Sequence, residues 1–147
     1  MIWFTDASAL VKRYVNETGS QWFRSELSNH QIVIAQITCV ELIAALTRRF
    51  RKGEITKLAL YQARKRFLIH RAHLEYEIIE TDDRVIEEAI RIAFTHGLKA
   101  YDAVQLATAM VAAKQFDTKR YVFVAADHQL LTAATNTGLP IETPLNH

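Results

Sequence analysis

Short apolar runs alternate along this chain with longer segments in which apolar residues recur at helical spacing. The runs occupy residues 2–5, 32–35, 76–79 and 121–126, and a weaker one covers 139–142. The second run, Ile-Val-Ile-Ala, is continuous and rich in β-branched residues, which is the pattern of a strand covered on both faces. Strands separated by helices predict a mostly parallel central sheet with helices on both sides, a three-layer α/β/α sandwich.

The segments between these runs predict helices. Short helices are expected after Asp6 and after Asp127, and longer ones over residues 21–29, 38–51, 55–71, 82–96 and 100–114. Gly53 separates the second and third of the longer helices, which therefore form a helical hairpin. The side chains expected on the buried face of its second helix are Leu58, Tyr61, Ala63, Phe67 and Leu68. The helix over 100–114 is almost entirely apolar and should be among the most buried.

The composition predicts one globular domain over residues 1–147, because 50% of the residues are hydrophobic and 23% are charged. Cys39 is the only cysteine, so the chain has neither an internal disulfide nor a zinc site made of several thiolates. No segment approaches the roughly 18 apolar residues of a membrane span, and the first residues do not resemble a signal peptide. We therefore expect a cytoplasmic protein without membrane contact.

Positive charge is concentrated in the predicted hairpin. The formal net charge of +2 is by itself too small to indicate nucleic-acid binding. However, nine of the 18 Lys and Arg residues lie between Arg48 and Arg71, against the single acid Glu54. This pattern is typical either of solvated helix faces or of a basic rim that attracts phosphates.

Two acidic residues come directly after apolar runs. Asp6 and Asp127 each stand between a predicted strand and the helix that follows, at the edge where open α/β sheets bind their ligands. Taken singly, each is also a good helix N-cap. If the first strand and the strand before Asp127 lie side by side, both carboxylates enter one crevice and form a pair.

Two further acids lie within predicted helices. Glu41, between Val40 and Leu42, gains nothing from capping, although it has the alternatives of pairing with Arg48 or facing water. Asp102 lies in the first turn of the most apolar helix, where it either complements the helix dipole or serves a site. If all four acids converge, each close pair costs on the order of 4 kcal/mol at an effective dielectric constant of about 20. Such a cluster requires protons or a cation.

Carboxylate ligands without cysteine or an obvious histidine suit Mg²⁺ or Mn²⁺ better than zinc. A metal ion of this kind activates water for attack on a phosphodiester, so no nucleophilic side chain is needed. His70 and His73 have the spacing i, i+3, but no third ligand is fixed near them, and we expect them to be solvated. Phosphatases that form an aspartyl phosphate need a second acid where this chain has Ser8. Response receivers need adjacent acids near the first strand, which this chain lacks, so neither class fits the sequence.

Four segments together resemble the PIN-domain ribonucleases, especially the VapC-type toxins. They are the run D-A-S-A-L-V-K-R-Y from Asp6, Glu41 in its helix, the run A-Y-D-A-V-Q-L-A-T-A around Asp102, and V-A-A-D ending at Asp127. The resemblance implies a three-layer α/β/α domain in which Asp6, Glu41, Asp102 and Asp127 hold Mg²⁺ or Mn²⁺. It also implies hydrolysis of RNA that leaves a 5′-phosphate.

Two positions qualify this resemblance. Ser8 matches a position that hydrogen-bonds within the acidic site, although a hydroxyl there also suits a helix start. Many relatives carry Thr or Ser two residues before the last acid, where this chain has Ala125. The resemblance therefore implies a supporting hydroxyl near Asp127 that this chain lacks.

The resemblance also implies partners. A small cognate antitoxin would cover the active site with an extended segment and place an arginine on the carboxylates, and the toxin would be a homodimer. The hairpin over residues 38–71 offers a surface for the antitoxin, for a second protomer or for RNA, and the sequence does not choose among them. The alternative function is that of a PIN-like protein-binding module with weak or no nuclease activity.

Overall fold

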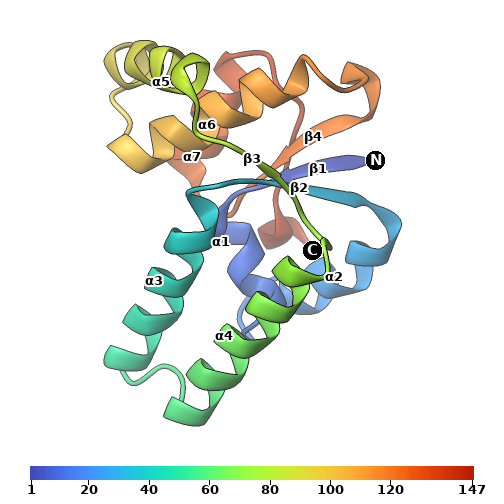
Figure 1. Cartoon of the computed structure of the whole chain (residues 1–147), viewed down its shortest axis with the longest axis vertical. Coiled ribbons are helices and arrows are strands. Elements are labelled where there is room, and N and C mark those ends of the chain that lie inside the picture. Colours follow the sequence, from blue (N-terminus) through green and yellow to red (C-terminus); the bar gives the residue numbers. More distant parts are fainter.

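Five parallel strands form the centre of the molecule in the computed structural model, which describes residues 1–147 (Figure 1). The strands are β1 (Ile2–Thr5), β2 (Gln31–Ala35), β3 (Glu77–Ile79), β4 (Tyr121–Val124) and β5 (Ile141–Glu142). Their order in the sheet is β3-β2-β1-β4-β5, and every neighbouring pair is parallel. Because β1 is central and the chain continues first to one side and later to the other, the sheet has a switch point at the carboxyl end of β1. β1 and β4 lie side by side, which is the condition under which Asp6 and Asp127 enter one crevice.

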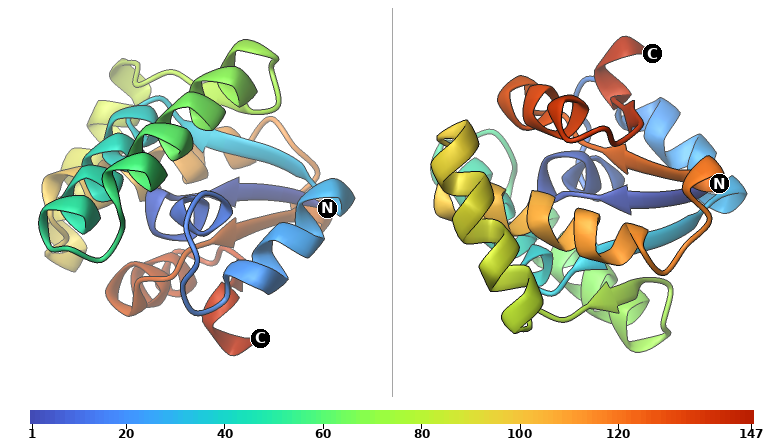
Figure 2. Two further views of the ribbon diagram at one scale, coloured as in Figure 1. Left: turned by 90° about the horizontal axis from the view of Figure 1, so that it is seen from below. Right: turned by 90° about the horizontal axis from the view of Figure 1, so that it is seen from above.

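Helices cover both faces of the sheet and make the predicted three layers (Figures 1 and 2). The helices are α1 (Ala7–Leu10), α2 (Ser20–Glu26), α3 (Thr38–Arg51), α4 (Lys57–Ala72), α5 (Asp83–His96), α6 (Ala100–Ala113) and α7 (His128–Asn136). The helix expected after Asp6 is shorter than its pattern suggested, since α1 ends after four residues and continues as the 3₁₀ turn η1 (Val11–Arg13). None of the helices is both long and apolar enough to cross a membrane.

Alternate side chains of β1 enter two separate hydrophobic cores. Ile2 and Phe4 pack with α5, α6 and α7, whereas Trp3 packs with α1 to α4. Both faces are therefore buried, which explains the continuous apolar runs. Within the first core, nine of the 14 residues of α6 are buried, as predicted for this helix. Gly97 ends α5 with a left-handed backbone (φ 64°), so the chain turns directly from α5 into α6.

The α3–α4 hairpin projects from the sheet, and its second helix is less buried than predicted (Figure 1). Only Ala63 and Phe67 of the expected face are buried, whereas Leu58, Tyr61 and Leu68 are 67%, 48% and 47% exposed. The prediction was wrong for these three because α4 contacts the body along one narrow stripe, and the helix periodicity alone does not show how much of the apolar arc is covered.

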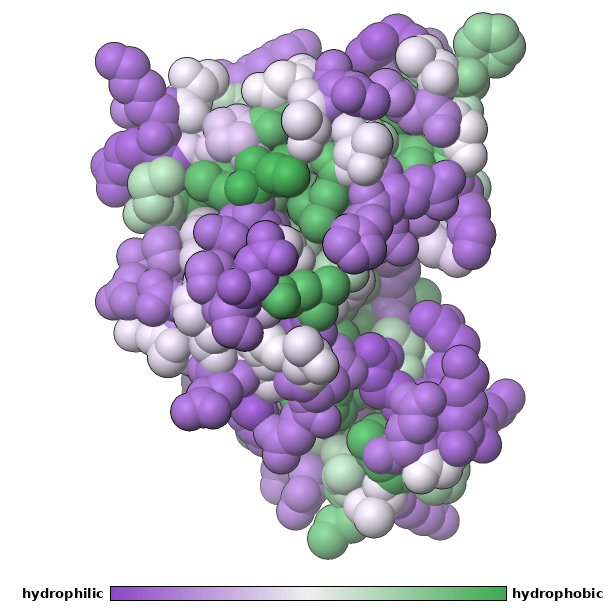
Figure 3. Space-filling model, turned by 180° about the vertical axis from the view of Figure 1, so that it is seen from behind, coloured by the Kyte–Doolittle hydropathy of each residue, from purple (hydrophilic) through white to green (hydrophobic).

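The basic residues of the hairpin are mostly solvated. Of the nine Lys and Arg residues between Arg48 and Arg71, only Arg49 is not exposed, and Figure 3 shows a largely hydrophilic surface at the protruding end. Solvated helix faces therefore account for most of this charge. His73 is exposed as expected, but His70 is half-buried, and its Nδ1 lies 2.7 Å from the hydroxyl of Tyr14. The expectation that His70 is solvated was wrong because Tyr14 of the α1 turn reaches the inner side of α4.

Candidate active site

All four predicted acids line one cavity of about 500 Å³ at the carboxyl ends of the strands. Asp6 follows β1 and Asp127 follows β4, while Asp102 lies in the first turn of α6. Glu41 enters from the first turn of α3, the helix that follows β2. Ser8 also lines the cavity, so the switch point of the sheet brings together every residue that the sequence proposed for the site.

Asp6 is the most deeply buried of the four acids and is rigidly held. It is 4% exposed, and its Oδ1 caps α1 by accepting a hydrogen bond from the backbone N–H of Ala9 (3.0 Å). The Ser8 hydroxyl lies 2.7 and 2.9 Å from the two carboxylate oxygens and donates to them. The same hydroxyl accepts from the backbone N–H of Ala126 at 2.8 Å. Ser8 therefore connects the carboxylate after β1 to the turn after β4, close to the position where Ala125 lacks a hydroxyl.

Asp127 acts as a helix cap. Its Oδ1 accepts a hydrogen bond from the backbone N–H of Leu130 at 2.8 Å, which satisfies one of the free donors at the start of α7. The structure thus confirms the capping function that the sequence left open for Asp127, as it does for Asp6. A second function for Asp127, as a ligand, remains a prediction.

Burial disfavours the ionised form of three of these carboxylates, although Arg48 and Lys99 line the same cavity. Burial raises the pKa of Asp6 to about 7, and repulsion from Asp102 adds to the shift. Burial also raises the pKa of Glu41 to about 7, with further repulsion from Asp6 and Asp102. The pKa of Asp102 is raised by burial and by the charge of Asp127. Shifts in this direction mean that the cost of burying the ionised form exceeds the stabilisation that nearby hydrogen bonds and positive charges supply.

The structure adds two side chains that the sequence analysis overlooked. Gln105 of α6 is fully buried, and its Nε2 donates to the hydroxyl of Thr38 (2.7 Å) and to Oε2 of Glu41 (3.3 Å). The sequence pattern marks the helix over 100–114 as an apolar surface with one acid. A glutamine three residues after Asp102, among Ala, Val and Leu, was the available signal, because a buried amide needs partners.

A hard divalent cation fits the donor set, although the side chains do not form a closed ligand cage. No group of three or more His, Cys, Asp or Glu residues is arranged to hold an ion. However, Oε1 of Glu41 is buried without any hydrogen-bond partner. Mg²⁺ or Mn²⁺ would satisfy a carboxylate oxygen that has no hydrogen-bond partner and lies beside other carboxylates. The evidence that a divalent cation fits is therefore the set of carboxylate oxygens and the unpaired Oε1 of Glu41.

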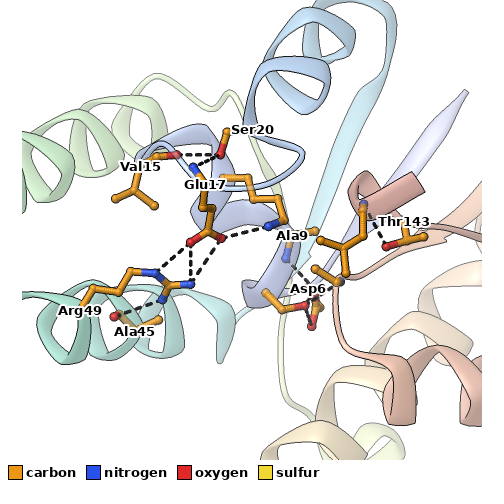
Figure 4. Close-up of polar contacts among 12 residues, drawn as sticks. Asp6, Ala9, Val15, Glu17, Ser20, Ala45, Arg49 and Thr143 are labelled. Atoms are coloured by element: carbon orange, nitrogen blue, oxygen red, sulfur yellow. Dashed lines mark hydrogen bonds and ion pairs between the residues drawn. The ribbon is translucent and has the colours of Figure 1, made fainter. Parts of the chain in front are cut away.

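An ion-pair cluster connects α3 to η1 and to the loop that follows η1 (Figure 4). The carboxylate of Glu17 forms ion pairs with the Lys12 Nζ at 3.0 Å and with the Arg49 guanidinium at 3.0 to 3.4 Å. Lys12 follows the helix that begins at Asp6, and Arg49 is two turns beyond Glu41 on α3. The cluster therefore connects the element that carries Asp6 to the helix that carries Glu41.

The raised pKa values predict an unusual dependence of stability on pH. Ionised Asp6 and Glu41 destabilise the fold above pH 7, and this cost decreases progressively as the pH falls from their folded pKa of about 7 toward the ordinary values of 3.8 and 4.5. In the presence of chelator, lowering the pH from 8 to 5 should increase the free energy of unfolding by on the order of 2 kcal/mol through Asp6. Denaturant unfolding followed by circular dichroism measures it.

The matched control is the Asp6→Asn variant, which lacks the titrating group. Burial lowers the pKa of His30 and His70, so their protonation opposes the effect at the acid end of the range. The difference between wild type and variant removes this contribution. If the difference in unfolding free energy is the same at pH 5 and pH 8, Asp6 does not titrate as described.

The fold and the cavity together define an α/β domain with a carboxylate site at the switch point of a parallel sheet. The chain belongs to the PIN domain family, whose sequence profile matches residues 3–130. A comparison with curated proteins finds no match.

Solved structures show the same fold at low sequence identity. PAE2754 from Pyrobaculum aerophilum is 22% identical, with a TM-score of 0.64 over 96% of this chain and 83% of that one. A toxin-antitoxin complex from Klebsiella pneumoniae contains a chain that is 18% identical, with a TM-score of 0.63 over 98% of each. FitAcB from Neisseria gonorrhoeae gives 19% identity and a TM-score of 0.60 over the full length of both chains.

Proposed function

We propose that this protein is a Mg²⁺- or Mn²⁺-dependent endoribonuclease that hydrolyses RNA phosphodiester bonds. The observation that carries the proposal is the convergence of Asp6, Glu41, Asp102 and Asp127 on one cavity, where burial raises the pKa of the first three. Structural needs explain the capping oxygens of Asp6 and Asp127, but they do not explain a half-buried glutamate whose Oε1 is buried without a hydrogen-bond partner.

The four carboxylates would hold the ion, and Ser8 would keep Asp6 in a fixed orientation. The chemistry that such an ion supplies when bound is the activation of water and the neutralisation of charge at a phosphodiester. Arg48 and Lys99 line the same cavity and bring positive charge for the phosphates on either side of the scissile bond. Tyr101 is 47% exposed at the rim, where its ring is available to stack on a base of single-stranded RNA.

Incubation of the purified protein, free of any partner, with a varied panel of RNAs tests this proposal. We expect cleavage with Mn²⁺ or Mg²⁺, no cleavage with chelator, and products that carry a 5′-phosphate when their ends are sequenced. Intact RNA in every metal-containing reaction would contradict the nuclease and favour a PIN-fold binding module. Cleavage that continues in chelator would contradict the metal dependence alone.

We further propose that the protein is the toxin of a toxin-antitoxin pair and acts in the cytoplasm. The similarity to chains from toxin-antitoxin complexes supports an antitoxin partner. An antitoxin segment that carries an arginine would complement the carboxylates of the cavity. Expression of the protein alone should arrest growth, and co-expression of a small protein encoded beside it should relieve the arrest. Normal growth with an active nuclease would contradict the toxin.

A homodimer is the third part of the proposal, and α5 supplies the argument. Ile86, Ile90 and Phe94 follow one another at intervals of four residues on its outer side and are 42%, 61% and 93% exposed. An apolar row of this kind favours contact with a second copy of the chain. In sedimentation experiments we expect twice the monomer mass of 16.8 kDa.

Ile90→Glu should weaken this dimer at least about tenfold, because it places a charge in the centre of an apolar interface. Leu58→Glu is the matched control, since Leu58 is also exposed but lies on α4. Dimers of unchanged affinity in Ile90→Glu would show that α5 is not the interface. A monomeric wild type would contradict the homodimer itself.

A further inference from the structure

The structure points to Gln105 as a positioning residue for Glu41, a function that rests on the proposed metal site. Gln105 lies one turn after Asp102 on α6, and its side chain reaches α3. Helix α6 would thus contribute to the site twice, directly through the carboxylate of Asp102 and indirectly through the amide of Gln105.

The orientation of the amide follows from its partners. Its Nε2 lies 2.7 Å from Oγ1 of Thr38 and 3.3 Å from Oε2 of Glu41, so it donates one hydrogen to each. If the amide were reversed, its oxygen would face Glu41, and two acceptors would meet without a proton whenever Glu41 is ionised, as a metal ligand must be. The nitrogen is therefore the atom that faces Glu41.

Two oxygens without hydrogen-bond partners indicate that the contact between Gln105 and Glu41 prepares Glu41 to bind a ligand. Oε1 of Glu41 and Oε1 of Gln105 are both buried and both lack a hydrogen-bond partner. A structural link between α6 and α3 needs only the bond to Thr38, and it would not require a carboxylate with one oxygen left orphaned. Gln105 occupies Oε2 of Glu41 and leaves Oε1 free, which fixes the carboxylate for one further electropositive partner.

A comparison of Mn²⁺ binding by wild type and Gln105→Met tests this function without relying on cleavage. Methionine keeps the volume of glutamine but has no donor, and electron paramagnetic resonance reports the free Mn²⁺ directly. Loss of a residue that orients a metal ligand weakens binding by about 10- to 100-fold, so we expect at least a tenfold loss. Thr108→Val is the matched control, because Thr108 is equally buried on α6 and its hydroxyl bonds only within the helix, to Val104.

The Glu41→Gln background separates positioning from a general effect on the fold. If Gln105 acts through Glu41, Gln105→Met should not weaken Mn²⁺ binding further in that background. Equal losses in both backgrounds, wild-type affinity in Gln105→Met, or a matching loss in Thr108→Val would overturn the inference while leaving the metal site intact. If the wild type binds no Mn²⁺, the metal site fails, and this function fails with it.

Discussion

Asp6→Asn is expected to reduce RNA cleavage by about 1000-fold or more while the protein remains folded. Removing a carboxylate from a metal site forfeits several kcal/mol of transition-state stabilisation, and each 1.36 kcal/mol corresponds to a factor of about ten in rate. The asparagine oxygen can still accept the hydrogen bond from the backbone N–H of Ala9, so the cap of α1 remains. Single-turnover cleavage at saturating Mn²⁺ measures the effect.

The stability of the same variant shows whether a loss of activity comes from unfolding. Because ionised Asp6 is buried at a cost, Asp6→Asn should be more stable than wild type at pH 8 when metal is absent. Asp82→Asn is the matched control, since Asp82 also caps a helix, through the N–H of Val85 at 3.1 Å, but does not line the cavity. More than a tenth of wild-type activity in Asp6→Asn would remove Asp6 from the catalytic site.

Much of the site could be predicted because two of its acids directly follow strands, and the ends of strands are visible in the sequence. The apolar runs before Asp6 and Asp127 fix where two strands stop, and the alternation of strands and helices then predicts a common edge. Glu41 and Asp102 were identifiable because local helix structure does not account for an acid among apolar helix residues. For these residues, short-range pattern and tertiary position agree, so the structure brings all four acids to one cavity.

The contacts between helices could not be predicted in the same way. The amide of Gln105 meets Glu41 across 64 residues, and the pairing depends on the angle at which α6 and α3 approach. The same reason explains the error on α4, because the apolar arc of a helix shows only which side is suited to burial. How much of that side is covered depends on where the helix leaves the body, and Tyr61 and Leu68 remain exposed.

The Lys12–Glu17–Arg49 cluster is another such contact, and it has a consequence for the site. Lys12 is 4% exposed, so its ammonium depends on the single carboxylate within reach. Glu17 also accepts from Arg49, whose guanidinium donates to the carbonyl oxygen of Ala45 in its own helix. One carboxylate therefore contacts two cations and connects α3, with Glu41, to the turn that follows Asp6.

Glu17→Gln should therefore destabilise the protein by about 3 kcal/mol, because it leaves the Lys12 ammonium buried without a counter-charge. This loss corresponds to a decrease of roughly 6 to 12 °C in the melting temperature of a chain of this length. Differential scanning calorimetry measures the decrease. Glu54→Gln is the matched control, since Glu54 is exposed and makes no ion pair, and its effect should stay within about 0.5 kcal/mol.

A second substitution distinguishes a buried charge from a lost packing contact. Lys12→Met in the Glu17→Gln background removes the uncompensated ammonium and keeps the apolar stem, so it should restore part of the lost stability. In wild type the same substitution should instead destabilise, because Glu17 and Arg49 then lose the third member of the cluster. If Lys12→Met lowers stability equally in both backgrounds, the charge of Lys12 is not what makes Glu17 necessary, and α3 is held by its apolar contacts alone.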